Sequence, residues 1–133
     1  MRVLTVLLWV VLGCGSPAPS GDPVELATGV HPELPERSDG IIGCRTFYNV
    51  GLLIVDPEYG TAAEDSRGGV RPLIWPVGYA ALRLAAGEVV VLDRTGEVVA
   101  TTGQKYQFWA GRWSDDRMIP FHVSNGCVNA LSE

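Results

Sequence analysis

The stretch from Glu88 to Thr102 reads EVVVLDRTGEVVATT, and it decides the fold of this chain. Two runs rich in β-branched residues, Glu88 to Leu92 and Glu97 to Thr102, flank the tetrapeptide Asp93-Arg94-Thr95-Gly96. β-Branched residues favour strands, and a glycine supplies the positive φ that a tight turn requires. The stretch therefore predicts a β-hairpin.

Shorter segments on both sides of the hairpin have the same character. Pro72 indicates that the strand containing it lies at a sheet edge or begins late. Only residues 77–86 could form a helix, and their sequence reads equally well as a strand. The further strands that the pattern predicts are Phe47 to Val55, Val70 to Trp75, Gln104 to Ala110 and Ile119 to Val123.

These segments predict an all-β domain. Five or six short strands, with turn signals about every ten residues, are typical of a small barrel or a sandwich. A five-stranded, partly open barrel of the OB type suits the length best. We expect this domain to cover residues 39–133 and to follow a Pro/Gly/Ser-rich, disordered tether over residues 14–38.

The first thirteen residues form a separate segment. Met1-Arg2 carries one positive side chain, and residues 3–12 are apolar apart from Thr5. A basic start followed by about ten apolar residues is typical of a secretory signal peptide. A helix of that length, about 15 Å, is too short to span a bilayer.

The end of this segment, Val11-Leu12-Gly13-Cys14, resembles the lipobox of bacterial lipoproteins. The resemblance implies a signal peptide over residues 1–13, cleavage after Gly13 and a lipid on Cys14. It further implies a protein outside the cytoplasm, anchored to the bacterial cell membrane. The cysteine count supports this interpretation, because lipidation of Cys14 leaves Cys44 and Cys127 as an even pair for a disulfide.

A second resemblance concerns the domain itself. The run from Trp75 to Trp109, with Trp75-Pro76-Val77-Gly78-Tyr79 before the Val-rich hairpin, is similar to small uncharacterised actinobacterial lipoproteins. This similarity implies a β domain and no particular activity.

The charge of the chain argues against a nucleic-acid partner. The formal net charge is −5, and Lys105 is the only lysine. Nucleic-acid binding draws most of its affinity from basic side chains that displace counterions from phosphates. We therefore expect no nucleic-acid binding.

The residue pattern predicts no enzyme, no cofactor and no metal. Two alternatives stay open. His122 with Cys127 or a nearby serine could serve a small envelope hydrolase or thiol enzyme, although the sequence has no Gly-x-Ser-x-Gly motif. The second alternative is a calcium site in a loop over residues 56–65, whose carboxylates are Asp56, Glu58, Glu64 and Asp65.

Aromatic residues give the clearest indication of binding. Phe108 and Trp109 are neighbours in a predicted strand, so one of them should point away from the core. We expect a non-catalytic binding module whose ligand is an envelope protein or a cell-wall glycan. The rings predicted to form its binding surface are Trp75, Tyr79, Trp109 and Trp113.

Overall fold

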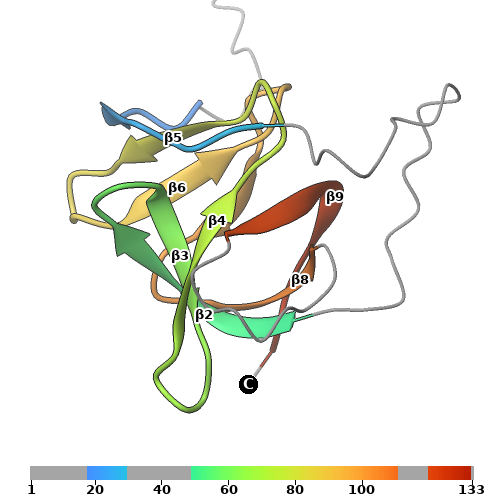
Figure 1. Cartoon of the computed structure of the whole chain (residues 1–133). Helices are drawn as coiled ribbons and strands as arrows, with labels where there is room; N and C mark the ends of the chain where they lie inside the picture. The colour runs from blue at the N-terminus through green and yellow to red at the C-terminus, as the bar shows by residue number, and fades with distance from the viewer. Residues whose placement is uncertain (1–17, 30–48, 111–119, 133) are drawn as a thin grey trace, which may run out of the picture.

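The computed structural model describes residues 18–29, 49–110 and 120–132, apart from the side chains at positions 109, 110, 125 and 126. Nine strands and no helix lie within this part of the chain (Figure 1). In chain order the strands are β1 (Asp22–Val24), β2 (Asn49–Asp56), β3 (Gly60–Glu64), β4 (Val70–Ile74), β5 (Ala80–Arg83), β6 (Val89–Leu92), β7 (Val98–Thr101), β8 (Lys105–Ala110) and β9 (Phe121–Ala130).

Five of the strands close into a barrel. Their order around the barrel is β2-β3-β4-β9-β8, and β8 pairs with β2 to complete the circle. All neighbours are antiparallel except β4 and β9, which run parallel where Leu73 lies opposite Phe121. The predicted small OB-like barrel is therefore confirmed, with the difference that it is closed rather than partly open.

The other four strands form a second sheet in the order β1-β5-β6-β7. In the chain, β5, β6 and β7 lie between barrel strands β4 and β8, so these three strands are an insertion into the barrel sequence, whereas β1 precedes the barrel. The predicted hairpin forms one side of this sheet, because β6 pairs with the edge strand β7 and Val91 lies opposite Ala100. Figure 1 shows this sheet beside one end of the barrel.

Three hairpin turns share one backbone pattern. In each, the first residue donates its N–H to the carbonyl of the fifth, and the fourth donates to the carbonyl of the first. The fourth residue is a glycine with positive φ, which is the geometry of a type I turn followed by a G1 bulge. The turns are Asp65–Gly69, Leu84–Glu88 and Asp93–Glu97.

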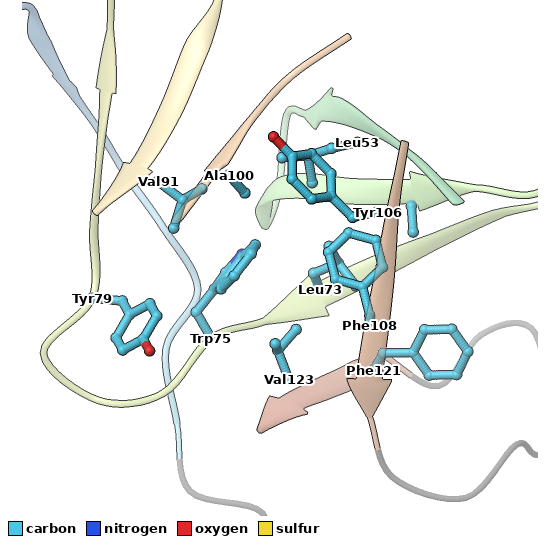
Figure 2. Packing of buried hydrophobic residues seen from close by; sticks show 11 residues of the cluster. Leu53, Leu73, Trp75, Tyr79, Val91, Ala100, Tyr106, Phe108, Phe121 and Val123 are labelled. Atoms are coloured by element: carbon cyan, nitrogen blue, oxygen red, sulfur yellow. The ribbon is translucent and has the colours of Figure 1, made fainter. Parts of the chain in front are cut away.

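One hydrophobic core joins the two sheets (Figure 2). Val91 and Ala100 enter it from the four-stranded sheet, while Leu53 and Leu73 enter it from the barrel. The barrel interior is narrow at Gly51, where an added Cβ would lie 3.0 Å from the Cβ of Ala63. Small residues at these inward positions let the five strands close around large rings.

The N-terminal segment departs from the prediction. We expected a tether over residues 14–38, but β1 pairs with β5 along three residues, Asp22 opposite Arg83. Further along, Ala27 and Gly29 exchange backbone hydrogen bonds of 2.9 Å with Trp75. Residues 18–29 therefore belong to the folded domain, and the tether prediction is wrong for them.

Two other segments also differ. Residues 77–86 contain a turn and β5, so the helical alternative is wrong. The predicted acidic loop over 56–65 contains β3, whose first four residues are buried. The predicted strands at Val70 to Trp75 and Gln104 to Ala110 are confirmed as β4 and β8, and Ile119 to Val123 is the start of the longer β9.

Candidate functional site

The predicted aromatic binding surface is wrong for two of its four rings. Trp75 has no exposed surface and Tyr79 is 8% exposed, so both belong to the core. The side chain of Trp109 and all of Trp113 lie outside the described residues. Phe108, the strand neighbour of Trp109, points into the core as the alternation allowed.

Trp75 lies at the centre of the core for identifiable reasons. Its indole Nε1 donates a 2.8 Å hydrogen bond to Oγ1 of Thr61, which is also fully buried. Its ring stacks on Tyr79 with centroids 6.0 Å apart and meets Phe108 edge-on at 6.3 Å (Figure 2). A tryptophan whose only polar atom is satisfied inside the protein is a structural residue.

His122 and Cys127 both lie in β9, but they differ in burial. Cys127 is 1% exposed, and His122 is half-buried beside Ile74 of β4. A catalytic thiolate must be reached by its substrate, so this burial argues against a thiol enzyme at Cys127. Cys44 lies outside the described residues, so its disulfide with Cys127 stays a prediction.

Two of the carboxylates considered as calcium ligands accept hydrogen bonds from backbone N–H groups. Asp56 accepts hydrogen bonds from the N–H groups of Glu58 and Tyr59 at 3.0 and 2.7 Å. Asp65 accepts from Arg67 and Gly69, both at 2.8 Å. Strand β3 separates these two turns by about 15 Å, too far to share an ion. Among the described residues, no three His, Cys, Asp or Glu side chains gather as metal ligands.

A different surface stands out on the outside of the barrel. Leu53 of β2 and Leu73 of β4 are fully buried, so the residues that alternate with them point outward. From Val50 to Ile54 on β2, and along β4, these outward residues are apolar. We call this surface the β2–β4 face; its outward residues are Val50, Leu52 and Ile54 on β2, Ala62 and Glu64 on β3, and Val70, Pro72 and Ile74 on β4.

The strand register makes this face continuous. Ala62 lies opposite both Ile54 and Pro72 and is fully buried between them. Val50 and Val70 are the most open members, 47% and 42% exposed, while the other β2 and β4 members of the face are half-buried. Glu64 is the one charged member.

Polar residues border the face on the β8 side. Lys105 lies opposite Leu52, and Gln107 lies opposite Val50. An apolar patch with a polar rim is typical of a surface that contacts another molecule.

A shallow hollow opens beside this face at one end of the barrel. The guanidinium of Arg71 lies 4.2 Å from the centre of the Phe121 ring at the hollow, and Arg71 is 5% exposed. The open volume is about 30 Å³, room for about one water molecule and far below a small-molecule pocket. The hollow is therefore the edge of a contact surface, to which Val50 and Val70 also belong.

The comparisons with known proteins identify no relative. No family model matches the chain, and neither a curated protein nor a solved structure matches it. No helix in the described part of the chain is long and apolar enough to cross a membrane.

The β2–β4 face was not predicted, although the sequence carried a signal for it. Residues 50 to 55 read Val-Gly-Leu-Leu-Ile-Val, without the apolar–polar alternation of a strand that has one solvated face. A continuous apolar run in a strand indicates that both faces are covered, either by the protein itself or by a partner.

Proposed function

We propose that this protein is a lipid-anchored cell-envelope binding module without catalytic chemistry. Residues 1–13 act as its signal peptide, and Cys14 carries the lipid that holds it to the membrane outside the cytoplasm. The lipobox-like sequence before Cys14 supports this anchor, and so does the even cysteine pair that remains when Cys14 is modified.

The observation that carries the binding function is the β2–β4 face. Its outward residues from Val50 to Ile54 on β2 and along β4 are apolar, and Val50 and Val70 are more than 40% exposed. Covering such a face with another apolar surface is favourable by about 25 cal/mol per Å² removed from water. In OB barrels, ligands bind on the face of the second and third strands, which here are β3 and β4.

The chemistry of this face favours a protein as the partner. Aliphatic side chains make up its exposed part, with one carboxylate and no basic residue. The aromatic residues of the described part that we expected to bind a glycan, Trp75 and Tyr79, are buried in the core. A neighbouring envelope protein with an apolar patch is therefore the better ligand than a cell-wall glycan or a nucleic acid.

A disulfide between Cys44 and Cys127 belongs to the same proposal. An oxidising compartment favours the pairing of two cysteines that remain after lipidation. Cys127 lies buried in β9, so the bridge would fasten the chain before β2 to the last barrel strand.

Photo-crosslinking in intact cells tests the binding face. A photoreactive residue at Val50 should capture one discrete partner, and the same residue at Val98 should not. Val98 is the matched control, because it is also a strand valine and is also 47% exposed, but on β7 of the other sheet.

A second substitution makes the test specific. Val70→Glu places a charge on the same face and should abolish the adduct formed at Val50, whereas Val77→Glu, at a position that is 50% exposed and outside the face, should leave it intact. Equal capture at Val50 and Val98, or an adduct at Val50 that still forms in the Val70→Glu variant, would contradict the proposal.

A further inference from the structure

The N-terminal strand limits how far the domain can lie from its anchor. Between Cys14 and the first residue of β1, Asp22, the chain has only residues 15–21. An extended chain advances at most about 3.5 Å per residue, so these residues reach no further than about 28 Å. The tether over 14–38 that the sequence predicted would have reached about 85 Å.

Contacts of the same segment shorten the free chain further. Gly21 packs directly on β5, since an added Cβ would lie 2.3 Å from the carbonyl oxygen of Arg83. On the other side of β1, backbone hydrogen bonds tie Ala27 to Tyr59 and to Trp75. The segment is thus fixed to the domain from Gly21 to Gly29, which leaves residues 15–20 as the spacer.

The position of β1 in the molecule then gives this short spacer a direction. Among the described strands, β1 is at the edge of the four-stranded sheet and pairs with β5 alone. Figure 1 shows β1, in blue, on one side of the molecule, and the turn that joins β3 to β4 on the opposite side. That turn, Asp65–Gly69, lies next to Val70 and to the hollow at Arg71.

We propose that the β1 edge of the four-stranded sheet lies against the membrane surface, with the Asp65–Gly69 turn and the Val50–Val70 end of the β2–β4 face pointing away from it. The partner of this edge is the lipid headgroup layer. The inference rests on the lipid anchor at Cys14 of the proposed function. A partner protein would then approach the domain from the side opposite the membrane.

Charge does not hold the edge on the lipid. Asp22 and Glu25 are exposed acidic residues at β1, and the exposed Arg83 of β5 lies opposite Asp22, so an anionic headgroup layer does not attract this edge. The short spacer alone keeps the edge near the membrane, by the high effective concentration that a short link imposes. Lengthening the spacer must therefore release the orientation.

Energy transfer to the bilayer measures this orientation in the full lipidated protein. A fluorophore is attached through a non-natural side chain at one of two exposed serines: Ser20, two residues before β1, or Ser66, in the Asp65–Gly69 turn. The protein is placed in phosphatidylcholine–phosphatidylglycerol vesicles that contain acceptor-labelled lipid. The label at Ser66 should lie about 30 Å farther from the bilayer, the diameter of a domain of this size.

We expect transfer from Ser20 to be several-fold stronger than transfer from Ser66. Insertion of twenty Gly/Ser residues between Ser16 and Pro17 should bring the two signals close together, because the spacer then spans the domain as a flexible coil. Equal transfer from both labels in the unmodified spacer, or stronger transfer from Ser66, overturns the orientation.

The intact mass of the same preparation separates this inference from the anchor. A lipidated chain with equal transfer from both labels contradicts the orientation alone. A chain without lipid, whose labels show no transfer, contradicts the anchor and the orientation together.

Discussion

The indole Nε1 of Trp75 donates a hydrogen bond to Oγ1 of Thr61 at 2.8 Å, and neither residue has any exposed surface. This bond joins the residue that follows β4 to the second residue of β3 inside the core. A buried polar atom is inexpensive only while its partner remains, so this pair makes a sharp test of the core.

Thr61→Val should destabilise the domain by about 1–3 kcal/mol, because valine has the shape of threonine but leaves Nε1 of Trp75 unsatisfied. Urea unfolding followed by tryptophan fluorescence measures the change. The double variant Thr61→Val with Trp75→Phe removes both polar atoms, and its loss should be smaller than the sum of the two single losses. Strict additivity would show that the bond contributes nothing.

Gly60→Ala should loosen the N-terminal segment from the barrel. Gly60 has a φ of +83°, and an added Cβ would lie 2.3 Å from the carbonyl oxygen of Glu25. Gly87→Ala is the matched control, since Gly87 has a φ of +97° with nothing within 4 Å of the added Cβ.

The control should cost about 1–2 kcal/mol from backbone strain alone. Gly60→Ala should cost more in urea unfolding, and it should expose residues 18–29 to limited proteolysis while Gly87→Ala does not. If both variants lost the same stability and resisted the protease equally, the contact between Gly60 and Glu25 would not hold the N-terminal segment on the barrel.

Acid should weaken the β6–β7 hairpin through Asp93. The hydroxyl of Thr95 donates a 2.6 Å hydrogen bond to this carboxylate and, together with the N–H groups of Thr95 and Glu97, holds the pKa of Asp93 below its ordinary value of 3.8. A carboxyl whose pKa is lower in the folded than in the unfolded state stabilises the fold above its unfolded pKa. That contribution is lost as the pH falls through the folded value.

Asp93→Asn should therefore be less stable than the parent protein at neutral pH, and the difference should shrink as the pH falls below 3.8. Urea unfolding at a series of pH values measures this. Thr95→Val removes the strongest of the bonds and should show part of the same effect. A difference between parent and Asp93→Asn that stays constant with pH contradicts the assignment.

Reduction should lower the stability of the native protein if Cys44 and Cys127 are joined. A bridge that closes a loop of roughly 80 residues is worth about 4–5 kcal/mol in the chain-entropy model. Thermal unfolding with and without a reductant, together with the two-dalton mass change, measures both the bridge and its effect. Cys127→Ser should lower the stability by the same amount, and Cys14→Ser should not. If the reductant changes neither the mass nor the melting temperature, the two cysteines are not joined.

The sequence predicted those strands whose residues favour strands by themselves. β6 and β7 are β-branched runs around a turn with Gly96, so local preference and tertiary structure agree. β3 was missed because Gly60-Thr61-Ala62-Ala63 has little preference for a strand. It becomes a strand because small residues fit the narrow barrel between β2 and β4.

The candidate site was harder to predict for a similar reason. Aromatic residues close to each other in sequence, such as Trp75 and Tyr79, fit a binding surface as well as a core, and composition cannot separate the two. Trp75 can be buried because Thr61, distant in the sequence, accepts the hydrogen bond of its indole N–H. Val50 is exposed because it lies on the outside of a barrel strand. Both depend on which strands become neighbours, and this information is not local.

The parallel contact between β4 and β9 also dictates the order in which the protein can be assembled. β5, β6 and β7 are consecutive, so their sheet can form as soon as that part of the chain has been synthesised. β4 can pair with β9 only after the chain up to Phe121 has been synthesised, because Leu73 lies opposite Phe121. Until then, β4 has an unpaired strand edge. The folding chain is thus most prone to aggregate in the interval before β9 docks, and a chaperone that shields β4 would protect it at that stage.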